Sequence, residues 1–284
     1  MDIKKVGVVG CGLMGRGIAE ISARSGYQTV VSEVNQELLD NGLENIDRSL
    51  TVAAKRGKLS EEDKNSTLGR LKGTVSMDGF ADCDLVIEAA IENMEAKKKI
   101  LASLDAACPP HAILASNTSC LSVVEMAMAT KRPSQVVGMH FFNPVPVMNL
   151  VEIVRSIVSS DDTVETAKAF GKSVGKTVIL AKDTPGFIVN RLLMPFLLEA
   201  MRMLEAGVAT KEDIDAGATL GLNHPMGPLT LLDYIGLDTT LYIANAMFDE
   251  YKDPLCAPPI MLKKMVAAGQ LGRKSGKGFY DYGK

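Results

Sequence analysis

The chain of 284 residues has too few of several residue types to belong to some common classes of protein. Its five cysteines are an odd number, widely scattered and without a C-x-x-C pair, so we expect neither a disulfide framework nor a metal site. No uncharged apolar stretch reaches the ~18 residues of a membrane span, and we expect no membrane partner. The net charge of −3 lacks the basic surplus typical of nucleic-acid-binding proteins. The sequence starts MDIKKVGVVG, directly in an expected strand, so we expect no targeting peptide and a cytoplasmic location.

The first part of the chain alternates short β-branched runs with helical patterns. The length alone predicts about two domains. Expected strands cover residues 6–9, 28–33, a short run at Val75, 85–87, 113–115 and 136–139. Expected helices cover residues 13–25, 36–56, a segment from Ser60, 94–107 and 121–129. This alternation predicts an α/β domain with a doubly wound, mainly parallel sheet.

The pattern becomes wholly helical after the motif Asp183-Thr184-Pro185-Gly186. We expect helices over residues 188–206, 211–220, 228–251 and 259–268, and no strand before the last few residues. We therefore place one domain boundary here. Residues 1–185 form the α/β domain, and residues 186–284 form an all-helical C-terminal domain.

A glycine-rich motif, GCGLMG at residues 10–15, lies between the first expected strand and the first helix. Its glycines allow a tight turn and a close backbone approach to a pyrophosphate at the helix N-terminus. Glu33 ends the second strand, about 20 residues further on, where an acid binds the adenosine ribose and disfavours a 2′-phosphate. The motif and Glu33 together predict a Rossmann-type domain that binds NAD. The alternative is a glycine-rich turn that binds no dinucleotide. The expected nucleotide contacts are Gly10, Gly12, Leu13, Met14, Gly15 and Glu33.

Only three histidines occur, and one of them, His140, lies at the end of an expected strand. Open α/β sheets bind their ligands at the carboxyl ends of the strands. Glu152 lies in an apolar run, residues 150–154, where an unpaired carboxylate is costly to bury. His140 is a candidate partner across a short loop, and such a pair suits a general base near neutral pH. The alternative is a core histidine bonded to a backbone carbonyl.

The sequence does not decide the roles of two further polar features, the run from Ser116 to Ser119 and Asn190. The run from Ser116 to Ser119 follows a strand at the same expected edge of the sheet. Its hydroxyl and amide groups either orient a substrate oxygen or cap the next helix. Asn190 lies early in the helix after the domain boundary, where a structural role is equally consistent with the pattern.

Five longer motifs together resemble the L-3-hydroxyacyl-CoA dehydrogenases, and most of all the short bacterial 3-hydroxybutyryl-CoA dehydrogenases. In chain order they are SNTSCLS (116–122), HFFNPVPVMNLVEI (140–153), DTPGFIVNR (183–191), NHPMGPLTLLDYIGLD (223–238) and GRKSGKGFYDY (272–282). The resemblance covers essentially the whole chain. It implies a reversible, NAD-dependent interconversion of (S)-3-hydroxyacyl-CoA and 3-oxoacyl-CoA, and a homodimer formed through the helical domain.

The resemblance also assigns roles to individual residues. The catalytic dyad of the family falls on His140 and Glu152, and its substrate-orienting residues fall on Ser119 and Asn190. Further NAD contacts implied are Glu92, Lys97, Ser119, Asn143 and Lys274. The family binds the CoA tail at the end of the second helix, which implies contacts from Ser49, Lys55 and Arg56. Without the resemblance, these cations would be interpreted as a solvated helix end.

Two positions depart from the family pattern. Cys120 stands where a second serine is usual, and Arg56 stands where lysine is common.

Two other functions are also consistent with the sequence. A dehydrogenase of free 3-hydroxy acids has a similar two-domain organisation, but such relatives usually rely on a catalytic lysine. A non-catalytic NAD-binding protein on the same fold is the other alternative.

Overall fold

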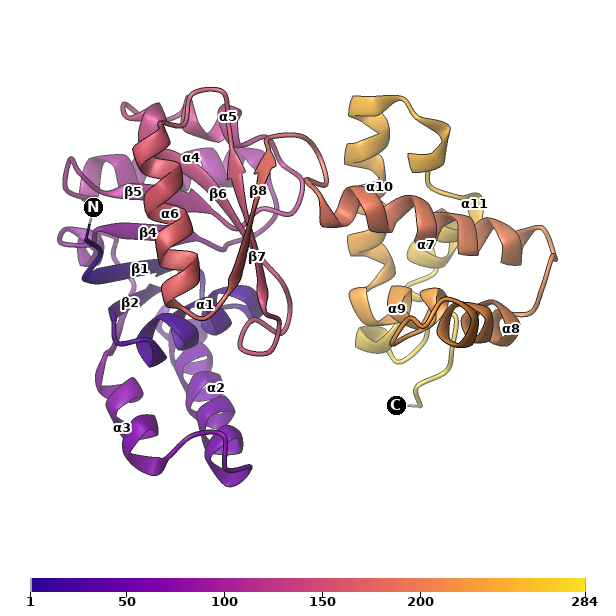
Figure 1. Cartoon of the computed structure of the whole chain (residues 1–284), viewed down its shortest axis with the longest axis horizontal. Coiled ribbons are helices and arrows are strands. Elements are labelled where there is room, and N and C mark those ends of the chain that lie inside the picture. The colour runs from indigo at the N-terminus through magenta and orange to yellow at the C-terminus, as the bar shows by residue number, and fades with distance from the viewer. Residues whose placement is uncertain (1, 284) are drawn as a thin grey trace. The chain divides into compact units, whose positions relative to one another are not determined.

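The structure is a computed structural model that describes residues 2–283. Its internal contacts divide the chain into two compact units, one ending at Asp183 and the other beginning at Thr184. Figure 1 shows the first unit as a sheet with helices packed on it and the second as helices alone. Within the described residues, no helix is both long and apolar enough to cross a membrane.

The first unit is built on one eight-stranded sheet of order β3-β2-β1-β4-β5-β6-β7-β8. Every neighbouring pair is parallel except β6 and β7, which are antiparallel. The strands are β1 (Lys5–Val9), β2 (Gln28–Ser32), β3 (Leu71–Thr74), β4 (Leu85–Glu88), β5 (Ile113–Ser116), β6 (Val136–Phe141), β7 (Leu150–Arg155) and β8 (Thr177–Lys182). The predicted doubly wound, mainly parallel sheet is confirmed.

The central strands are buried because helices cover both faces of the sheet. Strands β4, β5 and β6 are buried at every position, which explains their continuous apolar runs. The helices are α1 (Leu13–Arg24), α2 (Gln36–Lys55), α3 (Glu61–Gly69), α4 (Met94–Ala107), α5 (Val123–Ala127) and α6 (Asp161–Ser173). Most begin at a side chain that accepts a backbone N–H of the first turn, as Asn35, Ser60 and Asn93 do for α2, α3 and α4.

Three features of the first unit differ from the sequence-based expectation. The strand expected at Val75 is β3, which ends one residue earlier. Because β3 contains Lys72 and Gly73, its sequence has no clear apolar pattern. The prediction did not include α6 or the strand β8, whose half-exposed position at the edge of the sheet leaves a weak apolar signal. The run 150–154 is β7, a strand antiparallel to its neighbour β6.

The second unit contains α7 (Val189–Glu205), α8 (Lys211–Ala216), α9 (Pro228–Ile235), α10 (Leu237–Tyr251) and α11 (Ile260–Ala267). The expected all-helical domain is confirmed, but the single helix expected over residues 228–251 is wrong. Gly236, with φ +101°, ends α9 and begins α10. The buried carboxylate of Asp233 accepts the backbone N–H groups of Phe279 and Tyr280, which anchors the C-terminal segment on α9.

Candidate active site

The glycine loop makes a tight turn directly before α1. Gly10 has φ +91°, and a Cβ there would lie 2.9 Å from the carbonyl oxygen of Ala89. A Cβ on Gly15 would lie 1.7 Å from the carbonyl oxygen of Gly10, so only glycine fits. A Cβ on Gly12, the N-cap of α1, would meet nothing within 4 Å. The space above the helix N-terminus is therefore open to an anion, which its N–H groups and dipole favour.

A cavity of about 760 Å³ adjoins this loop and extends over the carboxyl ends of β1, β2 and β4. Glu33 lines it, with Oε1 accepting the backbone N–H of Cys11 at 2.7 Å and Oε2 accepting that of Val34 at 3.1 Å. These bonds hold the carboxylate beside the glycine loop while each oxygen keeps a further lone pair. An adenosine with its pyrophosphate fits this arrangement of an acid, an open apolar cavity and a helix N-terminus.

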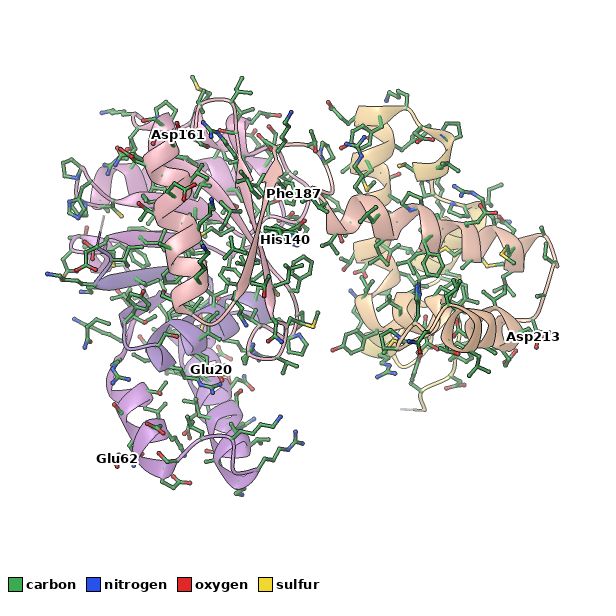
Figure 2. The ribbon with its side chains drawn as sticks, in the orientation of Figure 1. Glu20, Glu62, His140, Asp161, Phe187 and Asp213 are labelled. Atoms are coloured by element: carbon green, nitrogen blue, oxygen red, sulfur yellow. The ribbon has the colours of Figure 1, made fainter. Side chains whose placement is uncertain are left out.

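His140 and Glu152 face each other across the antiparallel pair of β6 and β7, and Figure 2 labels His140. The register pairs the two residues directly, so both side chains project from the same face of the sheet. The distance from His140 Nδ1 to Glu152 Oε2 is 2.6 Å. The side chains are 7% and 0% exposed, respectively. The buried carboxylate thus has the hydrogen-bonding partner that its position requires.

This contact determines which imidazole nitrogen is available for chemistry. An ionised carboxylate only accepts hydrogen bonds, so Nδ1 of His140 carries the hydrogen and Nε2 of the neutral ring has the lone pair. The ring of Phe142 also packs against the imidazole, with centroids 4.5 Å apart. The imidazole is held in one orientation, and an imidazolium would be stabilised by the adjacent charge.

The loop after β5 lies beside this pair and carries Ser119. Asn117 accepts the backbone N–H of Phe141 through Oδ1 at 2.9 Å, which ties the end of β5 to the end of β6. Ser119 donates its backbone N–H to Oε1 of Glu92 at 2.8 Å. The carboxyl ends of β4, β5 and β6 thus bring Glu92, Ser119 and His140 to one edge of the sheet.

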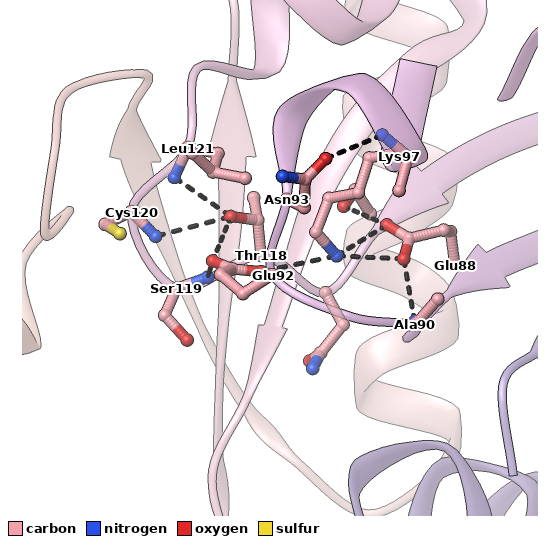
Figure 3. A network of polar contacts seen from close by, with 12 residues as sticks. Glu88, Ala90, Glu92, Asn93, Lys97, Thr118, Ser119, Cys120 and Leu121 are labelled. Atoms are coloured by element: carbon pink, nitrogen blue, oxygen red, sulfur yellow. Dashed lines mark hydrogen bonds and ion pairs between the residues drawn. The ribbon is translucent and has the colours of Figure 1, made fainter. Parts of the chain in front are cut away.

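The sequence analysis missed a buried carboxylate at this edge. Glu88, the last residue of β4, contacts the ammonium of Lys97, and Figure 3 shows Lys97 between the carboxylates of Glu88 and Glu92. Glu88 ends the apolar run Leu85–Glu88, and a carboxylate in such a position needs a buried cation or donor. That requirement, which identified Glu152, could also have identified Glu88.

A second cavity, of about 600 Å³, lies between α1, α2 and the loop that joins β6 to β7. Its cations are Arg16, Arg24, Arg48, Arg56 and Lys58. Of the residues expected to bind CoA, Ser49 and Arg56 line this basic groove, whereas Lys55 does not. Asn143, expected at the NAD site, lines the basic groove and not the cavity beside Glu33. Burial raises the pKa of Glu20 in the groove, against the opposing hydrogen bonds of Ser49 and Arg24.

The remaining two predicted residues belong to the second unit. Asn190 is buried in the first turn of α7. Lys274 contacts the carboxylate of Asp238 on α10, with Nζ 2.6 Å from Oδ2.

Comparison with known proteins identifies the family. The family model described as "3-hydroxyacyl-CoA dehydrogenase, NAD binding domain" matches residues 5–184, and that of its C-terminal domain matches residues 186–282. A 3-hydroxybutyryl-CoA dehydrogenase of Mycobacterium tuberculosis is 49% identical over 282 residues, 99% of each chain. A probable 3-hydroxybutyryl-CoA dehydrogenase of Bacillus subtilis is 45% identical over 282 residues, 99% of this chain and 98% of the relative.

Solved structures of similar proteins agree with this. The crystal structure of M. tuberculosis FadB2 matches with a TM-score of 0.98 at 48% identity, covering 100% of both chains. That of (S)-3-hydroxybutyryl-CoA dehydrogenase PaaH1 from Ralstonia eutropha matches with a TM-score of 0.96 at 45% identity, again over 100% of both chains.

The glycine loop, the acid after β2 and the sheet order define a dinucleotide-binding oxidoreductase. The chain belongs to the 3-hydroxyacyl-CoA dehydrogenase family, and its nucleotide is NAD. The family resemblance seen in the sequence, the cofactor and the enzyme class are thereby confirmed.

Proposed function

We propose that the protein catalyses the reversible oxidation of (S)-3-hydroxybutyryl-CoA to acetoacetyl-CoA with NAD. The observation that carries this proposal is the buried contact of 2.6 Å between His140 Nδ1 and Glu152 Oε2 at the carboxyl edge of a dinucleotide-binding sheet. Full-length relatives named 3-hydroxybutyryl-CoA dehydrogenase support the choice of substrate.

The His140–Glu152 pair provides the acid–base chemistry of the proposed reaction. Nε2 of His140 removes the proton of the C3 hydroxyl group, and the charge of Glu152 stabilises the resulting imidazolium. In the reverse direction the imidazolium returns that proton to the 3-oxo group. When bound, NAD would supply the acceptor for the hydride that leaves C3, and NADH would supply the donor in the reverse direction.

The substrate contacts extend from the dyad to the basic groove. Ser119 and Asn190 orient the 3-oxygen, as the corresponding residues do in the family. The cations of the groove, Arg56 among them, neutralise the phosphate groups of CoA, which a protein of net charge −3 must meet locally. Ser49 belongs to the same proposed subsite, whereas Lys55, which does not line the groove, is left out of it.

The proposed NAD contacts begin at the glycine loop and at Glu33. Glu33 binds the adenosine ribose, and its negative charge disfavours the 2′-phosphate of NADP. The further residues proposed from the family pattern are Glu92, Ser119, Asn143 and Lys274. Lys97, which is 1% exposed, would support the nucleotide site through Glu92.

A homodimer through the second unit is part of the same proposal. In α7 the side chains of Met194, Leu197 and Leu198 are buried within the unit. Leu192 on the same helix is 75% exposed, and Leu220 and Leu222, further along the same unit, are also exposed apolar side chains. A second copy that covered these residues would remove their apolar surface from water.

Steady-state oxidation of NADH tests the proposal. Acetoacetyl-CoA is expected to be turned over, free acetoacetate to be a poor substrate, and NADPH to replace NADH poorly. Equal turnover of free acetoacetate would favour the dehydrogenase of free 3-hydroxy acids. NADH binding without turnover of either substrate would favour the non-catalytic alternative.

A further inference from the structure

A buried ionic cluster lies behind the loop that carries Ser119. At its centre, Glu88 accepts four hydrogen bonds from three groups. Nζ of Lys97 lies 2.8 and 2.9 Å from its two oxygens, and Ser116 Oγ and the backbone N–H of Ala90 lie at 2.6 and 2.7 Å. Glu88 and Lys97 are 0% and 1% exposed, respectively. The pair is therefore screened from water and has one arrangement.

Lys97 connects this pair to the loop of Ser119 through a second carboxylate. Its Nζ lies 3.3 Å from Oε2 of Glu92, whose other oxygen accepts the backbone N–H of Ser119 at 2.8 Å and Thr118 Oγ1 at 2.6 Å (Figure 3). Thr118 Oγ1 in turn accepts the backbone N–H of Leu121 at 2.9 Å. A continuous chain of polar contacts thus runs from Glu88 to the backbone N–H groups of Ser119 and Leu121.

The two carboxylates depend on Lys97 in different ways. Glu88 is enclosed and cannot turn away, whereas Glu92 is 28% exposed and can rotate towards solvent. Without the ammonium, Glu92 would lose the cation that holds its Oε2 at this edge of the sheet. Glu92 would then leave the backbone N–H of Ser119.

We propose that Glu88 and Lys97 are positioning residues, which hold Glu92 and through it the backbone of Ser119 where the reaction needs them. This inference rests on the proposed function, in which Ser119 orients the 3-oxygen of the substrate. At 1% exposure, the ammonium of Lys97 acts on the NAD and substrate sites through Glu92. A small displacement of an orienting group far from the chemistry can cost up to ~100-fold in rate.

The test removes both buried charges together. Lys97→Met alone would leave Glu88 as an unpaired buried charge and destabilise the fold. The double variant Glu88→Gln/Lys97→Met has nearly the same side-chain volumes and leaves no fully buried charge unpaired, since Glu92 is 28% exposed. Lys98→Met is the matched control, because it removes a neighbouring lysine of α4 whose ion pairs with Glu95 and Glu125 lie at the surface.

Amide hydrogen exchange of the protein without nucleotide or substrate is the first measurement. Residues 117–122 are expected to exchange faster in the double variant, because the N–H group of Ser119 loses its acceptor. The same residues in the Lys98→Met control, and β1 in both variants, are expected to exchange as in the unmodified protein. Unchanged exchange of residues 117–122 in the folded double variant would overturn the inference.

The rate of acetoacetyl-CoA reduction is the second measurement. We expect kcat of the double variant to fall by ~10–100-fold with little change in its thermal midpoint. Glu92→Gln should lower kcat less in that background than in the unmodified protein, because its effect runs through the same contacts. A folded double variant with the kcat of the unmodified protein would overturn the inference.

The Glu92→Gln variant and the unmodified protein distinguish failure of the positioning role from failure of the proposed function. If the double variant does not fold, Glu92→Gln alone must speed exchange of residues 117–122, and unchanged exchange would overturn the inference. Failure of the unmodified protein to reduce acetoacetyl-CoA would contradict the proposed function. The exchange measurement requires no substrate and decides the positioning role independently.

Discussion

Replacing Glu152 by glutamine would remove the charge of the dyad while keeping its shape. The carboxylate is fully buried and contacts His140 Nδ1 at 2.6 Å. A hydrogen bond to a charged group contributes about 1.5–3 kcal/mol, and each ~1.4 kcal/mol corresponds to tenfold in rate. We therefore expect kcat for acetoacetyl-CoA reduction to fall by ~10–100-fold, because the imidazolium that donates the proton loses its stabilising neighbour.

The stability of the Glu152→Gln protein should change little. A neutral amide of the same size has a smaller desolvation cost than a buried carboxylate, which offsets the weaker hydrogen bond. Glu165→Gln on α6 is the matched control, since that carboxylate is exposed and pairs only with Lys168 among the ion pairs of the described residues.

The assay follows NADH absorbance at saturating acetoacetyl-CoA, with NADH affinity measured in parallel by fluorescence. The expected result is a lower kcat with an unchanged NADH affinity for Glu152→Gln, and no change in either quantity for Glu165→Gln. An undiminished kcat would refute the role of the Glu152 charge. An equal loss of NADH affinity would show that the substitution disturbs the nucleotide site instead.

Three further predictions concern other parts of the first unit. Glu33→Ala should raise KM for NAD, because the ribose loses its carboxylate; an unchanged KM would mean that the ribose is held elsewhere. Arg56→Ala should raise KM for acetoacetyl-CoA but not for an acetoacetyl-pantetheine thioester, which lacks the nucleotide phosphates; an equal rise for both would contradict the phosphate contact. Burial raises the pKa of the Cys120 thiol to about 12, so it stays protonated near neutral pH and should resist iodoacetamide in the folded protein. Labelling as fast as in denaturant would refute this. Because the pKa of this thiol in the folded protein exceeds its ordinary value of 9.0, its contribution to the free energy of unfolding is complete below pH 9 and is lost as pH rises towards 12.

The sequence predicted the parts of the fold that follow from local periodicity. The buried parallel strands are continuous apolar runs, and the glycine loop stands between the first strand and helix with its acid at the next strand end. The break at Gly236 escaped prediction because a single glycine inside a helical pattern does not reveal its φ. The antiparallel position of β7 also could not be predicted, because strand direction depends on the fold and not on apolar pattern.

The candidate site was predictable where a charged residue in an apolar run required a hydrogen-bonding partner. Glu152 in an apolar run required a partner, and His140 was within reach along the chain. The run of lysines in α4 was not interpretable in the same way, because it resembles a solvated helix face. Only the packing of α4 on the sheet shows that Lys97 turns inward to Glu88 while Lys98 stays at the surface.

The sequence also does not show which residues at the end of α2 line the basic groove. Ser49 lies in α2, and Arg56 lies about two turns further on, at its C-cap; both line the basic groove. Lys55 is the immediate neighbour of Arg56 but points elsewhere, because adjacent residues of a helix face different directions. A cluster of cations in the sequence therefore predicts that a groove is basic, but not which of its members line it.

The most direct test of the account is the turnover of His140→Ala, measured together with its NADH affinity. We expect acetoacetyl-CoA reduction to be abolished while NADH binds as in the unmodified protein, because the imidazole transfers the proton and does not hold the nucleotide. Substantial remaining turnover, or a matching loss of NADH affinity, would contradict proton transfer by this residue.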